Sequence, residues 1–366
     1  MVRRRRETSL RSRDGTRGLN TVVALALAAP VAVAAQVLSW PPPIAFAAAA
    51  AGLVPASKLL GDATEDLALR AGPRVGGLLN ALLGTASLLI IAVFALDKGL
   101  LDLVKATITG SILGYLLVVI GLSAFLGGVR NGTQYFDRQE AGMSATLMIL
   151  SVVALSLPAM YGQLVPDRNS GPVESFSEAV AILMLVVYLL SVYYSLFWRI
   201  EEQAIAGVHQ LSGRWPAAVA GAALVSALLL IVVLAKVLVD AIGPTVEATA
   251  MTEFFVGMVV IPLVGSVSEH LLAFETAWRN RMDVSMSIAL GSSIQVALYV
   301  APLLVFASLI LGHPMDLIFT QIELVALAAA ALVTTLVAFD GESNWLEGVM
   351  VLAVYTLLVL AFFWWP

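Results

Sequence analysis

Long apolar stretches, separated by short polar or glycine- and proline-rich segments, run through almost the whole chain. Splitting the sequence at those breaks predicts eleven helices, expected at residues 19–38, 44–60, 75–96, 103–127, 143–163, 176–198, 216–240, 251–278, 284–311, 317–338 and 345–365. About 20 mainly apolar helical residues are enough to cross the hydrocarbon core of a bilayer, which is about 30 Å thick. The pattern therefore predicts an all-α polytopic membrane protein.

Composition agrees with this interpretation. Of the 366 residues, 60% are hydrophobic and 12% are charged, whereas soluble domains carry about 25% charged residues. Because a chain this apolar cannot cover itself with polar surface, lipid must be its main partner. The sequence has no Cys and only three scattered His. It therefore excludes disulfides, thiolate metal sites and cysteine nucleophiles, and it argues against a zinc site.

The charged residues predict an orientation. Residues 1–18 form a tail with seven Arg. A signal peptide is the alternative, but the apolar run at 19–38 is too long for one and Ser39-Trp40-Pro41 is a poor cleavage site. Lys and Arg gather in cytoplasmic loops. With the tail inside, sixteen of the 20 Lys and Arg fall on the inner side. We therefore expect a plasma-membrane or bacterial inner-membrane protein with a cytoplasmic N-terminus and an external C-terminus.

An internal repeat divides the chain into two halves. At an offset of 181 residues, Gly84-Thr85-Ala86-Ser87-Leu88 aligns with Gly265-Ser266-Val267-Ser268-Glu269, and Gly110-Ser111 aligns with Gly291-Ser292. We expect five-helix repeats at 44–198 and 216–365, a cytoplasmic linker at 199–215 and an extra first helix at 19–38. Five spans per repeat insert the second copy in the opposite direction, as in many secondary transporters, whose substrates bind near the midplane where the repeats meet.

Glu269 is the leading candidate for a functional residue in the membrane. A carboxylate at the bilayer centre costs about 2.5–3.5 kcal/mol on insertion scales, so it is there for function or for pairing. Hard cations take oxygen ligands, and Ser266, Ser292 and Gln295 offer such oxygens nearby. A proton and a metal ion compete for the same carboxylate oxygens. The alternative for each Ser is close helix packing.

Backbone carbonyls are a second source of ligands. Pro262 and Gly265 are expected to break the helix at 251–278, because Pro removes a donor and Gly loosens the turn. Carbonyls freed at such a break can coordinate a cation, although a plain kink is the alternative. In the first half, Gly84, Thr85 and Ser111 are equivalent to Gly265, Ser266 and Ser292 by the 181-residue offset.

Two further groups remain open to different interpretations. His270 adjoins Glu269 and is either a gate, a proton relay or an interhelical contact. Glu323 lies within the span at 317–338 and either pairs with another group or takes part in transport. Together with Glu269, these two residues are the candidates for carrying protons or for gating.

Several motifs resemble the calcium/cation–proton exchangers of the cation/Ca²⁺ exchanger superfamily over roughly residues 58–366. They are Gly76-Gly77-Leu78-Leu79-Asn80, Gly110-Ser111-Ile112-Leu113, Val264-Gly265-Ser266-Val267-Ser268-Glu269-His270, Arg279-Asn280-Arg281-Met282-Asp283, Ile288-Ala289-Leu290-Gly291-Ser292-Ser293-Ile294-Gln295, Gly312-His313-Pro314-Met315 and Asp340-Gly341-Glu342-Ser343-Asn344-Trp345-Leu346-Glu347-Gly348. The resemblance implies the fold of that family and a cation-exchange role. It implies neither an enzyme nor a cofactor nor a nucleic-acid partner.

The chain departs from the pattern of that family, which has Gly-Asn-x-x-Glu in each repeat, with both Glu residues binding the ion. The second repeat keeps Glu269 but has Ser266 for Asn. The first repeat has Thr85 for Asn and Leu88 for Glu, and a further Asn of the family is replaced by Tyr115.

These departures leave the transported ion open. One carboxylate does not neutralise Ca²⁺, so either a second carboxylate enters, for which Glu323 is the candidate, or the ion is monovalent, such as Na⁺ or K⁺, or the site is too weak to transport. We therefore expect a cation–proton exchanger. The alternative is a non-transporting relative that acts as a membrane partner or regulator. The sequence predicts no oligomeric state.

Overall fold

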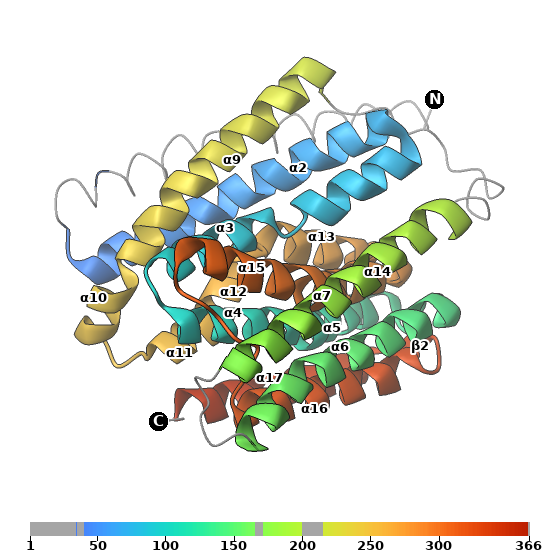
Figure 1. Ribbon diagram of the computed structural model, residues 1–366. Coiled ribbons are helices and arrows are strands. Elements are labelled where there is room, and N and C mark those ends of the chain that lie inside the picture. Colours follow the sequence, from blue (N-terminus) through green and yellow to red (C-terminus); the bar gives the residue numbers. More distant parts are fainter. Residues whose placement is uncertain (1–33, 35–39, 165–170, 200–214, 365–366) are drawn as a thin grey trace.

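The computed structural model describes residues 34, 40–164, 171–199 and 215–364. The basic tail, the predicted helix at 19–38 apart from residue 34, and most of the linker at 199–215 lie outside the described residues. The described part of the chain is almost entirely helical, and its halves are shown as blue to green and as yellow to red in Figure 1.

Each half is a succession of helices, two of which contain a π-helical segment, labelled η. The first half has α2 (Pro42–Leu83), α3 (Ala86–Asp97), α4 (Leu101–Leu113), η1 (Gly114–Val119), α5 (Ile120–Asn131), α6 (Arg138–Leu164), α7 (Gly171–Tyr194) and η2 (Ser195–Arg199). The second has α9 (Ala217–Asp240), α10 (Ile242–Ala248), α11 (Glu253–Phe255), η3 (Val256–Val260), α12 (Ile261–Gly265), α13 (Val267–Trp278), α14 (Met282–Gln295), η4 (Val296–Val300), α15 (Ala301–Leu311), α16 (Gln321–Ala338) and α17 (Trp345–Phe363).

These elements provide ten spans within the described residues. Nine are stretches of sufficient length and apolarity. Two of them, Pro42–Gly72 and Val75–Asp97, share α2, which is interrupted at Gly72, where φ is +83°. The tenth is the pair Glu253–Gly265 and Val267–Trp278, bent by 62°. Ten of the predicted spans are thereby confirmed, and the polytopic all-α fold with them.

Several predicted boundaries were wrong, and two of them have a clear physical reason. The span expected at 44–60 extends over Pro42–Gly72, because its charged second part, which resembled a loop, still buries Leu60, Ala63 and Asp66 at helical spacing. The span expected at 317–338 begins at Gln321. There Thr320 adopts extended backbone geometry and accepts a hydrogen bond from the backbone N–H of Glu323, which starts the helix.

The internal repeat is confirmed in the arrangement of the elements. Adding 181 to the bounds of α3 gives the bounds of α13, and adding it to the first residue of α5 gives the first residue of α15. The same offset brings the π-helical segment η1 onto η4 to within one residue. Because each half contributes five spans, equivalent helices run in opposite directions.

The two halves pack against each other along much of their length. In Figure 1, α2 and α9 lie side by side on one flank, while α6, α16 and α17 form the other. The continuous span α4–η1–α5 is central, because 72% of its most apolar window is buried, against 17% for the span formed by α17. Exposed apolar side chains of the outer spans suit contact with lipid.

A short two-stranded sheet joins the halves at one end of the bundle. β1 (Gln134–Tyr135) pairs antiparallel with β2 (Glu342–Ser343), with Gln134 opposite Ser343. The Gln134 side chain also donates to the carbonyl of Ala277 at 2.9 Å. Strands of two residues have no alternating pattern long enough to predict, so the sequence did not indicate them.

Near the opposite end, an ion pair joins two spans. Lys98, which follows α3, lies 2.9 Å from the carboxylate of Asp240 at the end of α9. The hydrogen bond and negative charge of Asp240 raise the pKa of Lys98 above its ordinary value. Both residues are partly exposed, so the pair adds little stability.

Candidate cation site

Two helix breaks face each other across the centre of the bundle. Thr85, between α2 and α3, has φ −100° and ψ 14°, and Ser266, between α12 and α13, has φ −116° and ψ 17°. The two interruptions are therefore nearly the same in backbone geometry. Their helices also contact each other, which brings the residues of both repeat motifs to one place.

Glu269 lies in the first turn of α13 and projects toward the first break. A Cβ atom on Gly84 would lie only 2.8 Å from Glu269 Oε1. Only a glycine therefore leaves room for this carboxylate. The other carboxylate oxygen accepts a hydrogen bond from the phenol of Tyr115, and the Ser292 hydroxyl lies beside Glu269.

Leu88 occupies the mirror position of Glu269. A Cβ atom on Gly265 would lie 3.3 Å from Leu88 Cδ1, so Leu88 faces Gly265 as Glu269 faces Gly84. The Leu88 side chain is 1% exposed. The site thus has a carboxylate on one side of its pseudo-twofold axis and hydrocarbon on the other.

The side chain of Gln295 hydrogen-bonds to the break between α2 and α3. Its amide nitrogen donates to the carbonyl of Ala81 at 2.6 Å and to the Thr85 hydroxyl at 3.1 Å. The Ala81 carbonyl also accepts from Tyr188 at 3.0 Å. Both lone pairs of the Ala81 carbonyl are therefore engaged. The amide oxygen of Gln295 instead points toward Gly84.

Ser266 differs from its neighbours in having an unused hydroxyl. Its Oγ is buried and, among the described residues, makes no hydrogen bond of normal geometry, although it lies beside the Tyr115 phenol. A buried hydroxyl without a partner costs about 1–3 kcal/mol. This oxygen is therefore available to a ligand at the centre of the bundle.

The structure brings together the predicted residues Gly84, Thr85, Gly265, Ser266, Glu269, Ser292 and Gln295. Ser111 belongs less directly to this group, because its hydroxyl donates to the carbonyl of Thr107 in its own helix at 2.7 Å. His270 packs its ring against the edge of Tyr115, with centroids 5.2 Å apart.

Glu323 makes its hydrogen bonds away from Glu269. Its Oε1 accepts from the Thr109 hydroxyl at 3.1 Å, and its Oε2 accepts from the backbone and side chain of Thr320 at 2.8 Å. Thr109 precedes Tyr115 by six residues, which corresponds to about 9 Å along a helix. Both oxygens of Glu323 are thus occupied at the start of α16.

Sequence reasoning missed the part that Tyr115 and Tyr188 play in the site. Tyr115 attracted attention only as a departure from the family pattern, yet its phenol donates to Glu269. Tyr188 stacks on Tyr299, with centroids 5.2 Å apart, and reaches the Ala81 carbonyl. An aromatic residue in an apolar helix is more often packing than a ligand, so the pattern along the chain carried no signal for either residue.

The chemistry available here is that of one carboxylate surrounded by neutral oxygens. Within the part of the chain that the structure describes, no group of three or more His, Cys, Asp or Glu could hold a metal ion. The oxygen atoms of Glu269, Thr85, Ser266, Ser292 and Gln295 nevertheless suit a hard cation. A proton on Glu269 competes with such a cation for the same atoms.

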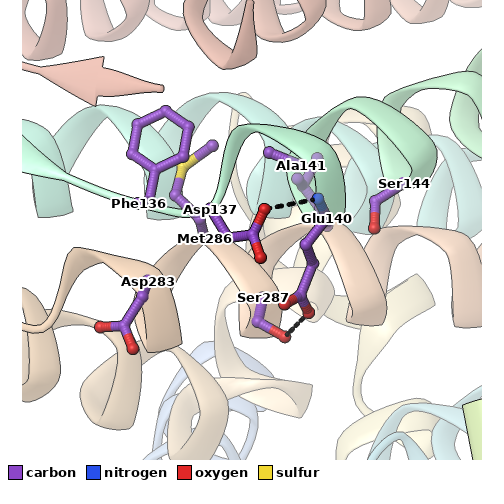
Figure 2. Close-up of a pocket in the computed structure, with 9 residues that line it drawn as sticks. Phe136, Asp137, Glu140, Ala141, Ser144, Asp283, Met286 and Ser287 are labelled. Carbon is purple, nitrogen blue, oxygen red and sulfur yellow. Dashed lines mark hydrogen bonds between the residues drawn. The ribbon is translucent and has the colours of Figure 1, made fainter. Parts of the chain in front are cut away.

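A shallow pocket lies elsewhere, beside β1 (Figure 2). Its carboxylates already have structural partners. Asp137 accepts the backbone N–H groups of Gln139 and Glu140 at 2.8 and 3.1 Å, and Glu140 accepts from Ser287 at 3.1 Å. This pocket is separate from the residues around Glu269.

Comparison with known proteins finds relatives over nearly the whole chain. A family described as sodium/calcium exchanger protein matches residues 42–197 and again 219–364. A Ca²⁺/H⁺ antiporter of Aphanothece halophytica is 36% identical over 93% of this chain and 96% of its own length. Another of the same name from Synechocystis sp. is 37% identical over 92% of this chain and 95% of its own.

A solved structure has the same architecture. The native structure of YfkE superposes with a TM-score of 0.83 at 33% sequence identity, and the match covers 94% of this chain and 99% of that one. The agreement in fold therefore extends over both repeats.

Proposed function

The chain belongs to the sodium/calcium exchanger protein family, and from this we propose that it is a secondary transporter that exchanges a metal cation for protons. The observation that carries the proposal is the buried carboxylate of Glu269, which faces a helix break and is surrounded by neutral oxygens. Relatives named Ca²⁺/H⁺ antiporters support it. Nothing in the comparisons favours the alternative of a non-transporting regulator.

Glu269 is the residue at which the two substrates exchange. The cation binds to its carboxylate together with oxygens from Thr85, Ser266, Ser292 and Gln295, and Gly84 and Gly265 leave room for the crossing side chains. Ser111 and the carbonyls near the breaks belong to the outer part of the site. Loading a proton onto Glu269 removes the negative charge that retains the cation.

Two residues are proposed for gating or proton transfer around this centre. His270 contacts the Tyr115 ring, so a shift of His270 moves the phenol that donates to Glu269. Glu323 is held by Thr109 on α4, the helix that leads to Tyr115. Both residues therefore act on the site through α4 and η1.

The proposed topology follows the charge distribution. Five-helix repeats at 44–198 and 216–365 surround the site, with the linker 199–215 in the cytoplasm. The N-terminus lies in the cytoplasm and the C-terminus outside, in a plasma membrane or bacterial inner membrane.

The test measures proton movement in everted vesicles containing the protein after addition of Ca²⁺, Na⁺ or K⁺. We expect at least one cation to release protons, and Glu269→Gln to abolish the signal, since Gln is similar in size but has no charge to exchange. Glu174→Gln is the matched control, because Glu174 is exposed in the first turn of α7. Absence of proton movement with all three cations near neutral pH contradicts the proposal.

A further inference from the structure

The site around Glu269 has a carboxylate on one side of its pseudo-twofold axis and hydrocarbon on the other, and this difference affects which ion it accepts. We propose that this site selects a monovalent cation of the Na⁺ or K⁺ class over Ca²⁺, and that Leu88 is the residue that sets this preference. The inference rests on the proposed exchange at Glu269 and narrows its substrate.

The net charge of the loaded site depends on the ion. Glu269 with a monovalent cation is neutral, whereas Glu269 with Ca²⁺ retains one positive charge. The surroundings are buried, since Leu88, Tyr115 and Ser266 are 1%, 0% and 3% exposed. An uncompensated charge in such surroundings costs several kcal/mol even after relaxation.

None of the other carboxylates in the described part of the chain contacts Glu269 or its ligands. Glu323 is the candidate second carboxylate, but Thr109 and Thr320 occupy both of its oxygens. The positive charge of Lys105 acts on the same carboxylate, and Lys105 is paired with Asp316 as well. His270 beside the site adds no negative charge.

The internal symmetry shows what stands where a second carboxylate would be. Leu88 is related to Glu269 by the 181-residue offset, and it faces Gly265 in the same manner as Glu269 faces Gly84. Its hydrocarbon therefore fills the symmetry-related place from which a second carboxylate would reach the centre. Likewise Gly114, equivalent to Gln295 by the same offset, provides no amide on that side.

The number of available oxygens also favours a monovalent ion. Ca²⁺ takes six to eight oxygen ligands from carboxylates, carbonyls and water. Here the Ala81 carbonyl is occupied by Gln295 and Tyr188, and the Ser111 hydroxyl is bound to Thr107. The remaining neutral oxygens and one carboxylate suit an ion of single charge.

The test uses purified full-length protein in liposomes with an imposed pH gradient. Uptake of radioactive sodium, rubidium as a probe for potassium, and calcium is measured separately and in competition. We expect sodium or rubidium uptake, and Ca²⁺ to compete at least about tenfold more weakly, as a penalty above about 1.4 kcal/mol requires.

Leu88→Glu is the decisive variant. By supplying the mirror carboxylate it should shift the ratio of calcium to monovalent uptake by about tenfold or more in favour of calcium. Leu88→Gln is the matched control, since Gln is similar to Glu in size and polarity but carries no charge. It should leave the ratio of calcium to monovalent uptake in favour of the monovalent cation. If a variant folds poorly, stabilisation of the parent protein against heat by each ion gives the same ranking of affinities.

The outcomes separate the two proposals. Calcium uptake by the parent protein that equals or exceeds its monovalent uptake overturns the selectivity inference but leaves cation–proton exchange standing. Equal shifts from Leu88→Glu and Leu88→Gln also overturn it, because charge is then not the cause. Absence of any cation-driven proton movement contradicts both proposals.

Discussion

The absence of a side chain at Gly84 makes room for the carboxylate of Glu269. A Cβ at this residue would lie 2.8 Å from Glu269 Oε1 and 2.9 Å from the carbonyl oxygen of Asn80. The second contact is to backbone, which cannot rotate away as a flexible side chain can. The contact with Glu269 comes from α13, whereas the Asn80 carbonyl belongs to α2 and also accepts the N–H of Gly84. Backbone conformation does not require glycine here, because Gly84 has φ −54°.

We therefore expect Gly84→Ala to impair transport strongly. Overpacking of this kind costs about 1–3 kcal/mol, and a displacement of about 1 Å at a reacting group can lower a rate by about a hundredfold. Cation-driven proton flux and thermal stability in detergent measure the two effects. Gly221→Ala is the control, since a Cβ there meets nothing within 4 Å. Equal flux in both variants would show that Gly84 is not confined by the carboxylate.

At the scale of elements, the π-helical segments are the most specific shared feature of the two halves. η1 and η4 occupy equivalent places, directly after the stretches that begin with Gly110-Ser111 and Gly291-Ser292. π-helical turns are rare and occur frequently at functional sites. Here η1 carries Tyr115, and η4 follows directly after Gln295, so both segments set the direction of side chains that reach the break residues.

The start of α16 explains the burial of Glu323 without a part in ion binding. Thr320 and Glu323 form a capping box, in which each side chain accepts a hydrogen bond from the backbone N–H of the other. We expect Thr320→Val to lower the free energy of unfolding by about 1 kcal/mol, the usual cost of losing such a cap.

Thermal unfolding and ion flux, measured on the same preparation, check this prediction. Thr320→Ser is the control, because it keeps the hydroxyl. A Thr320→Val protein of unchanged stability would contradict the capping role. A loss of flux without a loss of stability would instead favour the role of Glu323 in gating or proton transfer.

At the scale of the whole molecule, the proposed topology places two exposed residues, Gln139 and Trp364, on opposite sides of the membrane. Gln139 follows the β1 strand, and Trp364 follows α17. The chain contains no Cys, so single cysteines can be introduced without a background. Under the proposed topology, Trp364→Cys reacts with a membrane-impermeant maleimide in intact cells, and Gln139→Cys reacts only after the membrane is opened.

The unmodified protein serves as the control, since it has no thiol to label. The opposite pattern of labelling would reverse the proposed orientation, and labelling of both positions in intact cells would contradict an odd number of spans between them.

The sequence by itself determined the spans, the repeat and the single central carboxylate. These are properties of neighbouring residues along the chain: apolar length sets whether a segment crosses lipid, and a repeated motif needs no contact to be recognised. The absence of a carboxylate at Leu88 was visible for the same reason. Charged helix-forming residues in α2 were misread as a loop, because their burial depends on α9.

The tertiary structure decided which side chains meet. Tyr115 and Glu269 are 154 residues apart in the chain, and Gln295 and Thr85 are 210 apart. Such pairs depend on where helices cross and how each is broken, and neither is encoded in local periodicity. The same holds for β1 with β2 and for Glu323 with Thr109. The sequence thus determined which groups are present in the membrane, and the packing of the halves decided which of them surround Glu269.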